Sequence, residues 1–204
     1  MDVIIMAGGL AQRLNMGEKA CVLIENKPLI SYVIHALKNS KYIKKIFVST
    51  TINTPKTKEL IQLKYPEIVI INNDCGNYVI DMINSIKESK SKDPIMVIMC
   101  DIPLIKSEII DKIIEEYYIQ KKDALSTYVP LFICKKIGII PDTIFKKKDK
   151  FIVPVGINIL NPIKIDMEQE DFNYILEDER LALNINKKND LEICLKEMKK
   201  YSNR

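Results

Sequence analysis

Two glycines and two cations near the start of the chain have the types and spacing that bind phosphate. Gly8 and Gly9 follow an apolar run at residues 3–6, and Arg13 and Lys19 come shortly after them. Because glycine has no Cβ, its amide N–H group can approach a triphosphate closely, and the two cations can neutralise the negative charge. We therefore expect phosphate binding here, although a plain turn after a strand has a similar pattern.

This loop matches neither common nucleotide-binding motif. A P-loop ends in Gly-Lys-Ser/Thr, and the dinucleotide fingerprint places three glycines at fixed spacing at the start of a helix. Here the first convincing helix starts only near Pro28. The sequence thus argues against a Rossmann oxidoreductase.

A single carboxylate, Asp101, directly follows another apolar run that ends at residue 99. Mg²⁺ in proteins takes one or two carboxylates and leaves its other positions to waters and phosphate oxygens. Asp101 is therefore our candidate magnesium ligand. An aspartate that only opens a turn would give the same pattern.

The elements that must position these groups alternate between strands and helices. The expected strands are 3–6, 43–49, 68–71 and 95–99, and the expected helices are 28–39, 55–65, a segment around 79–86, and 107–119. Such alternation over 204 residues predicts one α/β domain, a doubly wound and mostly parallel sheet.

Sheets of this kind bind ligands at the carboxyl ends of their strands, so polar groups after different strands should meet there. The groups expected to converge are Gly8 and Gly9, Thr50 and Thr51, Asp74 and Gly76, and Asp101. A carboxylate such as Asp74 can accept two N–H donors from guanine, whereas adenine offers no such pair. The threonines, Asp74 and Gly76 are therefore candidates for recognising the base.

Beyond residue 120 the pattern changes, and we expect a mixed C-terminal portion. The expected features are an edge or bulged strand at 124–135, a lysine-rich turn at 145–150, apolar segments at 153–160 and 181–185, and a helix at 187–200. The lysines of the turn should form a solvated face; the alternative is that they attract an anionic co-substrate.

Composition excludes several classes of protein. A net charge of +4 with interspersed acidic and basic residues gives no case for nucleic-acid binding. The five cysteines form no C-x-x-C pair, which argues against zinc or redox sites and fits reduced thiols that mostly act as small core residues. No apolar stretch reaches the length of a membrane span, so we expect a cytoplasmic protein.

The N-terminal residues carry a family resemblance. Ala7, Gly8 and Gly9 with Arg13 and Lys19 resemble the A-G-G-x-G-x-R-x(n)-K signature of nucleotidyltransferases such as the molybdenum cofactor guanylyltransferases. Ala11 stands where the family usually has a third glycine, and its methyl group fits if the backbone torsions there stay in an allowed region. The resemblance implies a nucleotide-diphospho-sugar transferase-like variant of the Rossmann fold and a metal-binding aspartate, here Asp101.

Residues 53–59 and 153–158 also resemble the archaeal GTP:adenosylcobinamide-phosphate guanylyltransferases. This resemblance implies transfer of GMP from GTP to adenosylcobinamide phosphate, with Mg²⁺ as the expected metal. The implied roles are binding of the β- and γ-phosphates by Gly8 and Gly9, and catalysis by Arg13, Lys19 and Asp101.

The family also implies a second polar group beside the metal, from the C-terminal part of the chain. Asn158 and Asn186 compete for that place, and Asn186 fits equally well as the N-cap of the last helix. Gly156 is expected to let a substrate or the sugar of the nucleotide pack against its backbone, or else to mark a bulge.

Other functions remain open on the sequence. The acceptor could be molybdopterin or a phosphosugar, and the nucleotide could be CTP. The chain could also be a non-catalytic, nucleotide-binding regulatory subunit, a reading that Ala11 favours. A homodimer is expected by analogy only.

Overall fold

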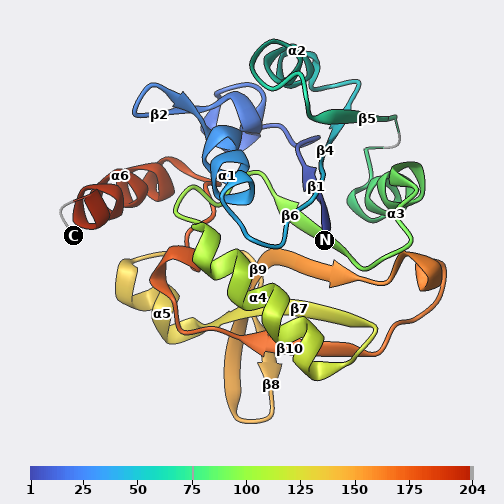
Figure 1. The fold of residues 1–204 in the computed structure, drawn as a ribbon. Coiled ribbons are helices and arrows are strands. Elements are labelled where there is room, and N and C mark those ends of the chain that lie inside the picture. The colour runs from blue at the N-terminus through green and yellow to red at the C-terminus, as the bar shows by residue number, and fades with distance from the viewer. Residues whose placement is uncertain (75, 203–204) are drawn as a thin grey trace.

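The first half of the chain forms four parallel strands, as the alternating pattern predicts. The structure, a computed structural model, describes residues 1–74 and 76–202. These strands are β1 (Asp2–Met6), β4 (Ile46–Thr51), β5 (Val69–Asn73) and β6 (Ile95–Met99). They lie in the order β6-β1-β4-β5, so the loop after β1 starts between two neighbouring strands (Figure 1).

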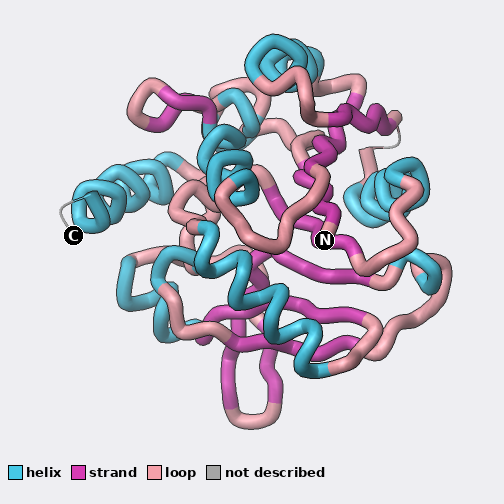
Figure 2. Tube along the Cα trace, viewed as in Figure 1, coloured by secondary structure: helices cyan, strands magenta, loops and turns pink. Residues whose placement is uncertain are grey.

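Four helices cover both faces of the sheet (Figure 2). They are α1 (Leu29–Lys38), α2 (Pro55–Lys64), α3 (Tyr78–Ser89) and α4 (Ser107–Gln120). Helices α1, α2 and α3 connect the four strands, and α4 follows β6. Alternate side chains of β1 enter different cores: Val3 and Ile5 pack with α1 and α4, whereas Ile4 and Met6 pack with α3. This period of two is what a strand buried on both faces requires.

The second half of the chain adds the mixed portion. It contains β7 (Ala124–Pro130), β8 (Phe145–Lys147), β9 (Lys150–Leu160) and β10 (Asp171–Ile175), followed by α6 (Lys188–Ser202). Strand β9 is antiparallel to both β6 and β7, and the full order is β10-β7-β9-β6-β1-β4-β5. A mixed α/β sheet is therefore confirmed.

Pro130 explains where the expected strand at 124–135 is wrong. The strand ends at Pro130, and α5 (Leu131–Ile137) follows immediately. Proline lacks the N–H group that a strand ladder needs, but it fits just before a helix. Gly138, at φ +83°, then ends the helix in the left-handed conformation.

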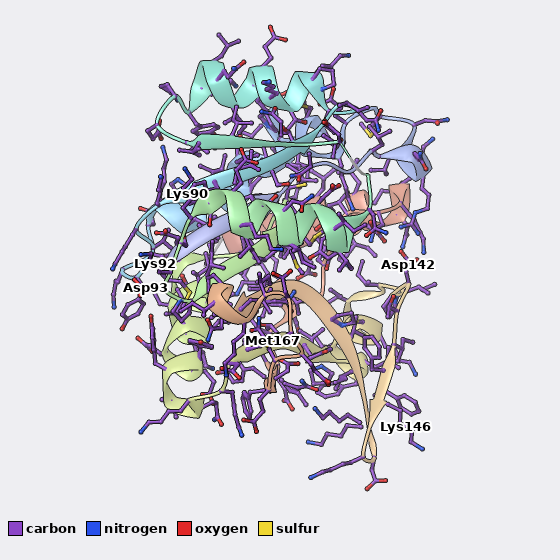
Figure 3. The ribbon with its side chains drawn as sticks, turned by 90° about the vertical axis from the view of Figure 1, so that its right-hand side faces the viewer. Lys90, Lys92, Asp93, Asp142, Lys146 and Met167 are labelled. Carbon is purple, nitrogen blue, oxygen red and sulfur yellow. The ribbon has the colours of Figure 1, made fainter. Side chains whose placement is uncertain are left out.

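The segment 145–150 is a hairpin rather than a simple turn. Strand β8 pairs with the first residues of β9, and the lysines there are exposed. Figure 3 shows Lys146 on this hairpin, which projects from the body of the protein.

Two other parts of the C-terminal half differ from a plain reading of the sequence. Strand β10 gave no clear apolar signal, because its residues are only half buried at the edge of the sheet. The apolar segment 181–185 is mostly buried but forms no strand, because Leu181 ends the 3-10 helix Glu179–Leu181 and residues 182–185 continue as irregular chain.

Short elements complete the chain. They are the 3-10 helices Gln12–Leu14, Lys19–Cys21 and Pro162–Lys164, and the small hairpin of β2 (Leu23–Ile24) and β3 (Lys27–Pro28). Cys100, Cys134 and Cys194 are buried core residues, as expected, whereas Cys75 lies outside the described residues. Within the described ranges, no helix is long and apolar enough to span a membrane.

Candidate active site

The loop after β1 passes very close to the end of β4. A Cβ atom built on Gly8 would lie 2.5 Å from Cγ2 of Thr51, so this position accepts only glycine without rearrangement. The Thr51 hydroxyl donates a hydrogen bond to the Gly8 carbonyl (3.3 Å), and the Ala7 N–H donates to Ser49 O (2.9 Å). Gly9, by contrast, is exposed and has open space where a Cβ would point.

Ala11 takes a conformation that does not need glycine. Its φ of −82° is negative, and its methyl group is buried. The Ala11 N–H donates to Gly17 O (2.7 Å), and the Lys19 N–H donates to Gly9 O (3.1 Å). These two bonds hold the loop closed, so alanine is compatible with its shape.

Lys19 joins the two side chains predicted to bind the metal. Its Nζ donates to Oδ2 of Asp101 (2.5 Å) and to Oδ1 of Asn186 (2.6 Å). Asp101 follows β6 and is only 3% exposed, and Asn186 lies just before α6. The three residues therefore meet at the carboxyl end of the parallel strands, as expected for this sheet.

Asn184 also belongs to this cluster and was not among the predicted residues. Its Nδ2 donates to Oδ1 of Asp101 (3.2 Å) and lies 3.3 Å from the Val155 carbonyl. The Ile185 N–H donates to the backbone carbonyl of Asp101 (3.2 Å). The Asn-Ile-Asn spacing was the available signal, because alternate residues of an extended segment share one face.

The start of α6 is capped by Asp190 rather than by Asn186. Oδ2 of Asp190 accepts hydrogen bonds from the N–H groups of Asn186 (2.9 Å) and Lys187 (2.8 Å). The Asn186 side chain is thus available to accept from Lys19.

Arg13 lies at the other end of the cluster, in an ion pair with Asp142. Nη1 of Arg13 is 2.8 Å from one carboxylate oxygen of Asp142, and Nζ of Lys187 is 2.8 Å from the other. Hydrogen bonds from Lys187 and then Arg13 hold the pKa of Asp142 below its usual range. Asp142 lies on the loop before β8 (Figure 3). Nothing in the sequence marked it as a site residue.

These groups line one cleft of about 520 Å³. Of the predicted residues, it contains Arg13, Lys19, Asp101, Gly156, Asn158 and Asn186. Part of its wall is largely apolar and includes Tyr128, Ile139, Ile140, Val153 and Pro154. The cleft therefore combines charged side chains of both signs with a surface suited to an apolar group.

Gly156 brings strand β9 close to the end of β6. Its φ is +82°, and a Cβ atom there would lie 2.5 Å from Cγ of Met99. Both the backbone conformation and the space thus require glycine. This places backbone atoms of β9 directly beside the cleft.

The remaining predicted residues do not line this cleft, although they belong to the same edge of the sheet. Thr50 is fully buried and directs its hydroxyl toward the Ile71 carbonyl (3.4 Å), so it supports the sheet. Asp74 and Gly76 are exposed beyond the end of β5, with Gly76 at φ +69°. Base recognition by these residues stays a prediction.

Neither the thiol nor the phenol nearest to Asp101 is suited to be a nucleophile. Burial, and then the charge of Asp101, raise the pKa of Cys100 to about 12. Desolvation, and then Asp101, also raise the pKa of Tyr78. Both groups stay protonated near neutral pH, so neither is activated as a nucleophile.

The oxygen atoms of the cluster suit Mg²⁺, which needs only one or two protein ligands, better than a metal ion whose ligands all come from the protein. In the described ranges, no group of three or more His, Cys, Asp or Glu side chains gathers. Asp101 and Asn186 instead offer one carboxylate and one amide oxygen, both now directed at the ammonium group of Lys19. Mg²⁺ accepts so few protein ligands when substrate phosphates supply the rest.

Comparisons with known proteins identify the family of this chain. Residues 3–130 match the family model described as a MobA-like NTP transferase domain. The adenosylcobinamide-phosphate guanylyltransferase of Methanocaldococcus jannaschii is 33% identical over 98% of both chains. The molybdenum cofactor guanylyltransferase of Shewanella halifaxensis is 28% identical over 56% of this chain and 54% of its own length.

Solved structures show the same fold at low identity. HddC from Yersinia pseudotuberculosis, complexed with GMP-PN, has a TM-score of 0.72 at 16% identity and covers 97% of this chain and 99% of its own. A CMP:2-keto-3-deoxy-manno-octonic acid synthetase complexed with CTP has a TM-score of 0.71 at 12% identity, covering 98% of both chains. The fold is thus that of known nucleotidyltransferases.

Proposed function

This chain belongs to the MobA-like NTP transferase family, and from that premise we propose that it transfers GMP from GTP to adenosylcobinamide phosphate. The products would be adenosylcobinamide-GDP and pyrophosphate. The observation that carries the choice of acceptor is the extent of similarity: the adenosylcobinamide-phosphate enzyme matches over nearly the whole chain, whereas the molybdenum cofactor relative matches over about half.

The reaction we propose is a direct displacement at the α-phosphorus of GTP. A phosphate oxygen of the acceptor attacks, the bond to the β-phosphate oxygen breaks, and its electron pair leaves with pyrophosphate. A phosphate monoester is already anionic near pH 7, so the cleft needs no general base. This fits a site whose nearby thiol and phenol stay protonated.

The residues of the chain would act by positioning and by charge. The N–H group of Gly9 is on the exposed part of the loop, where it could reach the β- or γ-phosphate. Lys19 and Arg13 would stabilise the charge that develops on the leaving pyrophosphate. Asp101 and Asn186 would hold Mg²⁺, which when bound polarises the α-phosphate. The apolar wall of the cleft would contact the acceptor.

The test is an assay with the purified protein, GTP, Mg²⁺ and adenosylcobinamide phosphate. We expect release of pyrophosphate together with adenosylcobinamide-GDP, and calorimetry should show stronger binding of GTP than of ATP or CTP. Asp101→Asn should lower turnover by about 100-fold or more while GTP binding falls much less. Asp166→Asn is the matched control, because Asp166 pairs with Lys87 on the surface. Transfer only to molybdopterin would refute the proposed acceptor, and absence of nucleotide binding would refute the enzyme.

A further inference from the structure

Asp142 occupies Arg13, which the proposed reaction assigns to phosphate, and Lys187, a second cation that lines the same cleft. Its two carboxylate oxygens each lie 2.8 Å from a cationic nitrogen, one on Arg13 and one on Lys187. These are the charge-assisted contacts that a phosphate group would make at the same place. All three side chains line the cleft that contains Lys19 and Asp101.

The ion pairs of Asp142 can break at little cost in free energy. In the part of the chain that the structure describes, neither Arg13 nor Lys187 has another carboxylate within ion-pair distance. The three side chains are 40% to 52% exposed, so water and ligands reach them and the pairs contribute little to stability. The lowered pKa of Asp142 keeps its carboxylate charged near neutral pH.

We propose that Asp142 is a specificity-determining residue, an internal anion that occupies Arg13 and Lys187 until a polyphosphate displaces it. The inference rests on the proposed function, because it takes the triphosphate of the nucleotide as the displacing ligand. A tethered carboxylate has a high effective concentration at its partners. A free ion with one small negative charge competes poorly against it, whereas a polyphosphate brings several charges to both cations at once.

The same competition should act after the reaction. Pyrophosphate, once its bond to the α-phosphate has broken, would lie against Arg13 and Lys187. The return of the Asp142 carboxylate to these cations would favour the departure of pyrophosphate. The residue thus weakens the binding of every ligand that reaches the two cations, and has no effect on one that ends at the α-phosphate.

Calorimetric titrations of the full chain with pyrophosphate, GTP and GMP test this proposal. Asp142→Asn keeps the size of the side chain but removes its charge. We expect pyrophosphate and GTP to bind about 3- to 10-fold more tightly to this variant, the range that two exposed ion pairs allow. GMP should bind unchanged, and the gain should shrink at high salt. Asp166→Asn, whose carboxylate pairs with Lys87, should match the unsubstituted protein throughout.

Several results would overturn the proposal. Unchanged pyrophosphate binding by Asp142→Asn would mean that Asp142 does not compete for the two cations. Weaker binding would mean that Asp142 orders them instead. An equal gain in affinity for GMP would reflect only the general loss of negative charge. If neither protein bound pyrophosphate, there would be no polyphosphate that displaces Asp142. Because the pyrophosphate titration uses no guanine nucleotide, it tests Asp142 separately from the proposed function, which failure to bind GTP would refute.

Discussion

The Nζ atom of Lys19 lies 2.5 Å from Oδ2 of Asp101, although 82 positions separate the two residues in the sequence. Both side chains are mostly buried, at 13% and 4% exposed. Removing one member of such a pair leaves the other charge without a partner in a site of low polarity, which costs more than the pair contributes. Stability and activity can therefore be separated here.

Lys19→Met should lower the free energy of unfolding by about 3 kcal/mol, because the Asp101 carboxylate then stays buried without its cation. The double variant Lys19→Met/Asp101→Leu should regain much of this loss and yet stay inactive. Urea denaturation and the transferase assay measure the two properties. Lys38→Met is the control: Lys38 pairs with Glu67 on the surface, so its loss should cost less than about 1 kcal/mol. A double variant as unstable as the single one would contradict the interpretation.

Gly8 and Thr51 should show strong coupling in a double-mutant cycle. Gly8→Ala places a methyl group against Cγ2 of Thr51 and should cost about 1–3 kcal/mol. Thr51→Ser removes that carbon but keeps the hydroxyl that bonds to the Gly8 carbonyl, so the double variant should recover about 1 kcal/mol. Gly9→Ala meets no atom within 4 Å and should be nearly neutral in stability. Additive costs in the thermal or denaturant measurement would exclude the predicted contact.

Glu18 should position Lys19 by fixing the loop to the start of α2. Its carboxylate accepts from the N–H groups of Lys56 (2.9 Å) and Thr57 (2.6 Å) and from the Thr57 hydroxyl (2.7 Å). Glu18→Ala leaves these donors without their acceptor, and we expect a loss of about 2–3 kcal/mol in stability.

The kinetic effect of Glu18 distinguishes positioning from simple stabilisation. At a temperature where the variant is fully folded, kcat should still be reduced, because Lys19 is less well held. Glu18→Gln, which keeps an acceptor oxygen, should restore part of it. Glu67→Ala, at an exposed position, serves as the control. Normal kcat in folded Glu18→Ala would show that Glu18 only stabilises the fold.

Glu179 should make stability depend on pH in the acid range. Hydrogen bonds from Lys136 and then Lys200 lower its pKa from 4.5 to about 2. A lowered carboxyl pKa gives stability that is fully present above the unfolded-state pKa and is lost as pH falls from about 5 toward 2. Glu179→Gln should be less stable by about 1 kcal/mol at pH 7, and the difference should shrink as pH falls and vanish only below the folded-state pKa of about 2. A constant difference across urea titrations at each pH would argue against this linkage.

Sequence patterns were sufficient to predict the strands and helices whose apolar periodicity is strong. The four parallel strands and their helices were predicted within a few residues, since each strand is buried on both faces and each helix has one apolar side. The sequence also pointed to Lys19 and Asp101 as candidates, because glycines and charges follow strands at recognisable positions, and their catalytic roles stay a prediction. Their contact itself depends on the arrangement of the sheet.

The rest required tertiary structure. Asp142 lies in an irregular loop, and only the approach of three distant segments brings it to Arg13 and Lys187. Strand β10 depends on its pairing with β7, which a half-buried segment does not reveal in its own sequence. Pro130 did carry a signal, but a bulge in a strand and the start of a helix both accommodate proline.

The hydrogen bond between Lys19 and Asn186 spans 167 positions, and it has a consequence for synthesis. Before the ribosome reaches residue 184, β1, β4, β5 and β6 are already complete, but Asn184, Asn186 and Lys187 do not yet exist. A nascent or prematurely terminated chain would hold Lys19 beside Asp101 at best, with neither asparagine to complete the cluster. Catalysis should therefore begin only once the segment leading into α6 has been translated.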